Sequence, residues 1–132
     1  MGNIKELQNR CAIFRDLEMR IWGDGDCVMM KIPLILDDGF GLVIKTRFVQ
    51  KNGMSMICIS DDGCIARHNP VNLADIRVLC LRYGLEYSII GDRKVVPLDC
   101  EIYRIVEGKK FRDVIWKIME LARSACDLDR EC

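Results

Sequence analysis

A two-residue Asn-Gly turn between two alternating segments constrains the fold of this chain more than any other feature. Asn52-Gly53 separates the segment 41–50 from the segment 54–60, and both segments are rich in β-branched and apolar residues. Asn-Gly between such segments is the strongest short-range signal for a β-hairpin, because both residues tolerate the positive φ of a type I′ turn. The sequence therefore predicts two antiparallel strands joined at this turn.

The turn also predicts which residues of the two strands face each other. With Asn52 and Gly53 as the loop, Lys51 faces Met54, and the pairs Val49–Met56, Phe48–Ile57 and Thr46–Ile59 follow. The face that we assign to the core carries Leu42, Ile44, Thr46, Phe48, Ile57 and Ile59. The opposite face mixes Lys45 and Arg47 with Val43, Val49, Met56 and Cys58. We expect a helix or another protein to cover part of this mixed face.

Helix and strand signals elsewhere complete the prediction of one α+β domain over residues 1–132. A first helix begins at the N-cap Asn3 and ends near residues 15–17, and a second runs from the N-cap Asn72 to Gly84. Further strands are predicted at 19–22, 27–35, 85–90 and 94–97, residues 99–106 form either one more strand or an irregular crossing, and a last helix is predicted at 110–126. The expected architecture is a twisted antiparallel sheet with three helices, in the order α-β-β-β-β-α-β-β-α.

Composition excludes several classes of function. Twenty basic and twenty acidic residues cancel, which gives no support to wholesale polyanion binding. No apolar run approaches the ~20 residues that span a bilayer, and the first residues lack the apolar core of a signal peptide, so we expect a cytoplasmic protein without membrane contact. Eight cysteines without any Cys-x-x-Cys pair indicate reduced, buried thiols.

Two Asp-Asp-Gly turns are the candidate functional feature. Asp37-Asp38-Gly39 precedes the first strand of the hairpin, and Asp61-Asp62-Gly63 follows the second, so both belong to the open end of the same hairpin. Aspartate and glycine are ordinary turn residues, and turn chemistry alone explains them. Clustered carboxylates also bind a divalent cation or a basic partner, since they repel one another unless neutralised.

Basic residues supply the second set of candidates. Lys45 lies opposite Ser60 in the predicted register, next to the acidic turns, and Arg47 shares its face of the sheet. A separate basic cluster stands before or within the start of the last helix and consists of Lys109, Lys110 and Arg112, with Lys117 further along. Solvated charge explains this cluster, and contact with phosphate or with an acidic protein surface is the alternative.

The turns and their surroundings resemble a small, uncharacterised domain family of bacteria and their phages. The resemblance covers about residues 20–125. It rests on Ile32-Pro33-Leu34 leading to Asp37-Asp38, then a strand, then Ile59-Ser60-Asp61-Asp62-Gly63, a helix and a late strand pair. Ser60 stands where the family usually has threonine, and Gly39-Phe40-Gly41 replaces a stretch in which the family often has a further aspartate. The resemblance implies a mobile-element setting and no established activity.

These observations favour a non-enzymatic accessory protein of a phage or mobile element that binds a host protein or protein–nucleic-acid complex. An inhibitor of a host defence nuclease, similar to an anti-CRISPR protein, is one form of this function. The candidate partner-binding residues are Asp37, Asp38, Asp61, Asp62, Lys45, Arg47, Lys109, Lys110 and Arg112. We expect no metal or other cofactor.

Two other functions remain open from the sequence. One is a metal-dependent nuclease or phosphoesterase that uses Asp38, Asp61, Asp62 and Lys45. The other is a small nucleic-acid-binding module that uses the basic residues. A homodimer is also plausible, because Met54, Met56 and Cys58 give the second sheet face apolar character.

Overall fold

A six-stranded antiparallel sheet forms the centre of the protein. The computed structural model describes residues 20–36, 38–69, 71–89 and 100–128. The strands are β1 (Arg20–Asp24), β2 (Cys27–Ile35), β3 (Gly41–Lys51), β4 (Met54–Ser60), β5 (Glu86–Ile89) and β6 (Cys100–Val106). Their order across the sheet is β1-β2-β3-β4-β6-β5, and every neighbouring pair is antiparallel.

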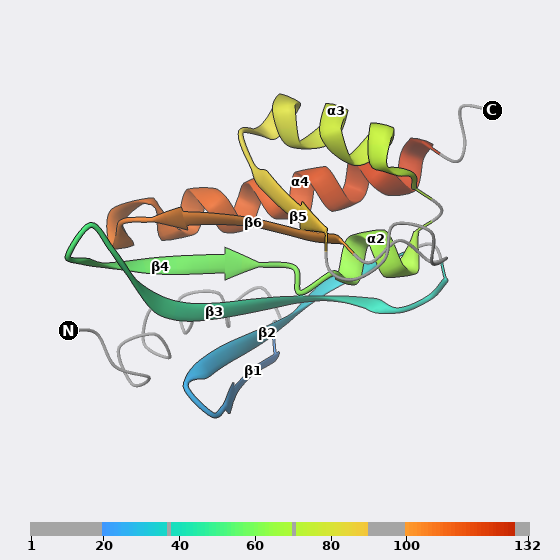
Figure 1. The fold of residues 1–132 in the computed structure, drawn as a ribbon. Coiled ribbons are helices and arrows are strands. Elements are labelled where there is room, and N and C mark those ends of the chain that lie inside the picture. The colour runs from blue at the N-terminus through green and yellow to red at the C-terminus, as the bar shows by residue number, and fades with distance from the viewer. Residues whose placement is uncertain (1–19, 37, 70, 90–99, 129–132) are drawn as a thin grey trace.

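The described helices gather on one side of this sheet (Figure 1). They are α2 (Cys64–His68), α3 (Leu73–Tyr83) and α4 (Phe111–Leu128), and a short 3₁₀ turn, η2 (Gly108–Lys110), leads into α4. Helix α4 contacts β4 and β6, and α3 packs against α4 and β5. The core lies between the helices and the sheet, where Ile57, Ile59 and Ile102 meet Ile115 and Ile118.

The hairpin predicted from the Asn-Gly turn is confirmed in its bounds and its register. Lys51 pairs with Met54, and the pairing continues through Thr46–Ile59 to Lys45–Ser60. Asn52 and Gly53 have φ values of 54° and 76°, as a type I′ turn requires. The face assigned to the core is buried at its centre, since Leu42, Ile44, Thr46, Ile57 and Ile59 are at most 1% exposed.

The α+β class and the antiparallel sheet are also confirmed, but the order of elements differs in detail. Helix α2 was not predicted, because only five residues form it and its N-cap, Gly63, has no side chain. Strand β5 pairs with β6. The strand predicted at 94–97 and the predicted first helix both lie outside the described residues. No helix of the described chain is long and apolar enough to cross a membrane.

Candidate functional site

The two acidic turns flank the open end of the β3–β4 hairpin. Strand β3 begins at Gly41 and β4 ends at Ser60, and Lys45 pairs with Ser60 across the hairpin. Asp38 therefore enters this end of the sheet from β2, while Asp61 and Asp62 leave it toward α2. Asp37 lies outside the described residues.

Asp61 is buried at this end and is saturated with hydrogen bonds. Asp61 is 0% exposed to solvent. Oδ1 accepts the backbone N–H groups of Gly63 at 3.0 Å and Ile102 at 2.8 Å, and Oδ2 accepts that of Ile65 at 2.9 Å. Burial raises the pKa of Asp61 to about 6, against the opposing effect of these three donors.

These bonds give Asp61 a structural role. Ile65 lies in the first turn of α2, where a carboxylate satisfies a backbone N–H that the glycine N-cap leaves unpaired. Ile102 lies in β6, so the same carboxylate joins the start of α2 to a strand 41 residues further along the chain. A buried carboxylate with both oxygens engaged offers no surface to a partner in this conformation.

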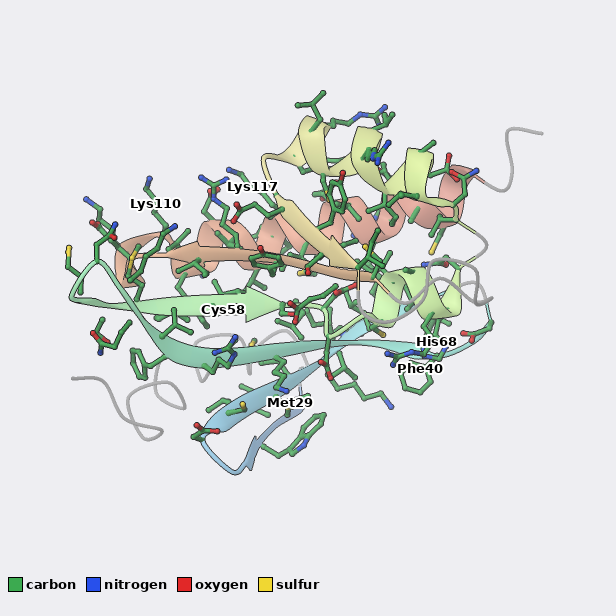
Figure 2. The ribbon with its side chains drawn as sticks, in the orientation of Figure 1. Met29, Phe40, Cys58, His68, Lys110 and Lys117 are labelled. Carbon is green, nitrogen blue, oxygen red and sulfur yellow. The ribbon has the colours of Figure 1, made fainter. Side chains whose placement is uncertain are left out.

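Asp38, by contrast, is half exposed and holds an aromatic pair in place. Its Oδ2 lies 2.5 Å from Nδ1 of His68 on α2, and its Oδ1 accepts the backbone N–H of Phe40 at 2.9 Å. The rings of Phe40 and His68 stack, with centroids 4.0 Å apart and planes within 3° (Figure 2). These bonds to Asp38, the one from His68 foremost, lower the pKa of its carboxyl.

Asp62 completes the exposed part of this end. Its side chain is 51% exposed, and Lys45 Nζ lies 4.0 Å from its Oδ1. The guanidinium of Arg67 donates to the backbone oxygen of Asp62 at 3.5 Å. The positive φ of Asp62, 53°, is one that aspartate tolerates better than most residues. We call Ile35, Asp38, Phe40 and Asp62, with the supporting His68, the acidic sheet end.

The sequence indicated the carboxylates of this site but missed its aromatic part. His68 lies on α2 with a side chain that is 17% exposed. Phe40 was considered only as a replacement within the first turn. No local signal placed His68 on a helix, because Asp61, which accepts the N–H of Ile65, lies two residues before the N-cap Gly63.

The other candidate residues lie elsewhere. Arg47 pairs with Cys27 and Cys58, on the sheet face that the described helices do not cover. Lys109 and Lys110 lie in η2 and Arg112 in the first turn of α4, next to the end of β6. The structure therefore separates the acidic sheet end from the basic cluster by the length of β4 (Figure 1).

The described residues bring no three histidine, cysteine, aspartate or glutamate side chains into a group that could hold a metal ion. Both oxygens of Asp61 are taken by backbone donors, which removes it from any ligand set in this conformation. The chemistry that this end presents is an exposed aromatic ring with carboxylates beside it.

Comparison of the chain with protein-family models, with curated proteins and with solved structures found no match. The fold and the site define an α+β protein in which one end of an antiparallel sheet presents an ordered aromatic and acidic surface.

Proposed function

We propose that the protein is a non-enzymatic accessory protein of a phage or mobile element that binds a host macromolecule through its acidic sheet end. The observation that carries the proposal is the Phe40 ring, which is 47% exposed although it is stacked on His68 and held by Asp38. The resemblance of the Asp-Asp-Gly turns to a phage and bacterial domain family supports the setting.

An aromatic side chain that is exposed and already ordered is typical of an interface anchor. It buries a large apolar area on binding and loses little conformational entropy. Ile35, 64% exposed, pairs with Gly41 and so lies beside the turn that carries Phe40. Two exposed apolar side chains, with the carboxylate of Asp38 beside Phe40 and that of Asp62 just beyond the end of β4, resemble the apolar centre and polar rim of a protein interface.

The charges favour a partner with a basic surface. Such a partner would offer an apolar pocket for Phe40 and arginine or lysine side chains for Asp38 and Asp62. Proteins that handle nucleic acids carry basic surfaces of this kind, because they contact phosphate. An inhibitor that covers the substrate-binding surface of a host defence nuclease is the specific form of the function that we propose.

Affinity capture from a host lysate tests this function with a matched pair of variants. Phe40→Ala removes the proposed anchor, whereas Leu81→Ala truncates a side chain that is 86% exposed on α3, away from the acidic sheet end. We expect a nucleic-acid-binding protein to be captured by the wild type and by Leu81→Ala, and to be lost with Phe40→Ala.

The captured protein must then change its behaviour. We expect the wild type to inhibit the nuclease activity or the nucleic-acid binding of that partner, and Phe40→Ala to inhibit it at least about tenfold less, as for the loss of one hot-spot side chain. Equal capture by both variants, or no specific capture by the wild type, would contradict the proposal.

The hydrogen bond between Asp38 and His68 favours one alternative, a phosphoesterase with His68 as an acid–base group. Calorimetry with magnesium and manganese, followed by hydrolysis of a phosphodiester substrate, distinguishes the two functions. Hydrolysis that His68→Ala abolishes and Arg123→Ala leaves unchanged would establish the enzyme. Arg123 serves as the control because it lies on α4 with a partner, Glu120, of its own.

A further inference from the structure

A hollow lies at the opposite end of β4 from the acidic sheet end. Its volume is about 270 Å³. Met56, Ile105 and Val106 are its apolar lining residues, and its charged residues come from the end of β6 and from η2. Val106 pairs with Ile57 near the start of β4, while Ser60, at the acidic sheet end, pairs with Tyr103.

The charges around this hollow are mainly positive. Arg104, Lys109 and Lys110 line it together with one carboxylate, Glu107. Glu107 lies 3.4 Å from the ammonium of Lys109, and the guanidinium of Arg104 donates to the backbone oxygen of Gly84 at 2.6 Å. Within the described part of the chain, the ammonium of Lys110 has no carboxylate in ion-pair contact. Figure 2 shows Lys110 at this end of the molecule and Lys117 further along α4.

We propose that this hollow binds a phosphate ester of mononucleotide size. Arg104, Lys109 and Lys110 line this one hollow, and arginine and lysine side chains are the usual partners of phosphate oxygens. Met56 and Ile105, both partly exposed, offer apolar contact to a base, and the volume, just below the ~300 Å³ of the smallest common ligand pockets, suits one nucleotide unit. Glu107 offers an acceptor for a sugar hydroxyl or a base amino group.

The ligand chemistry has two sources, a free nucleotide or a nucleotide unit of a nucleic-acid strand. Both present a phosphate next to an apolar base, so the same residues serve either. The site is separate from the acidic sheet end in the fold, and it shares no residue with it. Its test is therefore independent of the proposed partner.

Titration of the full-length protein with three probes, followed by NMR or calorimetry, tests the proposal. The probes are adenosine monophosphate, inorganic phosphate and a single-stranded hexanucleotide. We expect Lys110→Ala to weaken nucleotide binding by about tenfold, as for one charged hydrogen bond. Lys117→Ala is the matched control, since Lys117 lies on α4, pairs with Asp113 at 3.0 Å and does not line the hollow. It should change the affinity less than about twofold, as expected for a surface ion pair.

A second variant tests the shape of the site rather than its charge. Met56 is partly exposed, and Met56→Trp would fill the apolar side of the hollow without changing any charge. We expect it to abolish binding of the nucleotide while circular dichroism and the denaturation midpoint show a folded protein.

Each outcome decides the proposal. Binding of adenosine monophosphate indicates a free nucleotide, and binding of the hexanucleotide alone, with affinity that falls as salt rises, indicates a nucleic-acid strand. The proposal is overturned if none of the probes binds at millimolar concentration, or if Lys110→Ala and Lys117→Ala have equal effects. Inorganic phosphate that binds as tightly as the nucleotide would also overturn it.

Discussion

Two neighbouring aspartates of one Asp-Asp-Gly turn occupy opposite environments. Asp61 is 0% exposed and accepts three backbone N–H groups, whereas the side chain of Asp62 is 51% exposed. The difference arises because Asp61 points into the junction between β4, α2 and β6, and Asp62 turns outward with a positive φ. One carboxylate thus holds the fold together and its neighbour is available to a partner.

Asp61→Ala should destabilise the protein by about 2–4 kcal/mol. Three buried N–H groups lose their acceptor, at a cost of about 1–3 kcal/mol each. Part of that cost is offset, because the variant no longer buries a charge and because water can enter and bind the freed N–H groups. Chemical denaturation at neutral pH measures the change. Asp62→Asn is the control, because asparagine also tolerates positive φ, and it should stay within about 0.5 kcal/mol of the wild type. Equal stability of the two variants would contradict the role assigned to Asp61.

The raised pKa of Asp61 predicts an unusual dependence of stability on pH. Between the ordinary carboxyl value of 3.8 and the folded-state pKa of about 6, the folded protein holds a proton that the unfolded chain releases. The contribution of Asp61 to the free energy of unfolding therefore falls as pH rises through this window, by about 3 kcal/mol for a shift of about two units. Asp38 has a lowered pKa, so its contribution is lost at more acidic pH, below this window.

Denaturation of the wild type and of Asp61→Asn from pH 4 to pH 7 measures this effect. Asparagine cannot titrate, so the fall in stability attributed to Asp61 should disappear in the variant. Parallel stability curves for the two proteins across the window would show that Asp61 does not titrate there.

At the scale of elements, the sequence predicted structure wherever the local signal was strong. The Asn-Gly turn determined the bounds and register of β3 and β4, and Asn72 and Gly84 marked both ends of α3. Helix α2 escaped prediction because its N-terminal N–H group is satisfied by Asp61, outside the usual N-cap position. The β5–β6 pairing escaped because an intervening segment separates the strands, so no short turn indicated their register.

Helix α3 depends on its N-terminal cap. The side chain of Asn72 accepts the N–H of Asp75 at 2.9 Å, and the carboxylate of Asp75 accepts the N–H of Asn72 at 3.0 Å. Asn72→Ala should lower the free energy of unfolding by about 1 kcal/mol, and Asn72→Ser should retain most of it. Equilibrium denaturation measures both variants. A loss that serine does not rescue would mean that the asparagine acts through something other than the cap.

At the scale of the whole molecule, the sequence could predict the class of fold and that both acidic turns flank the open end of one hairpin, but not the surface around them. The hairpin register alone brought Asp38 and Asp62 to one end of the sheet. The stacking of Phe40 on His68 depends on α2 folding back over that end, which no local pattern encodes. The basic hollow likewise needs β4, β6 and η2 side by side, and only the complete sheet provides that arrangement.

The buried cysteines test whether all these layers unfold as one unit. Cys27, Cys58, Cys64, Cys80 and Cys100 are buried in β2, β4, α2, α3 and β6. Burial raises the pKa of the Cys80 thiol to about 12 and also raises the pKa of Cys27, Cys58 and Cys64, so very little reactive thiolate exists near neutral pH. In a single cooperative domain, these thiols should react with a labelling reagent at one common, slow rate set by global unfolding.

Mass spectrometry of the labelled peptides gives the rate for each cysteine. We expect denaturant to accelerate the five buried cysteines together, while Cys126, which is partly exposed, reacts earlier. Asp61→Ala should raise the common labelling rate by about the factor by which it lowers the equilibrium constant for folding, because Asp61 joins β4, α2 and β6. Separate rates for the cysteines of β2 and those of α3 would show instead that the two sides of the sheet open independently. In that case the acidic sheet end, which draws Phe40 from the β2–β3 connection and His68 from α2, would be assembled only part of the time.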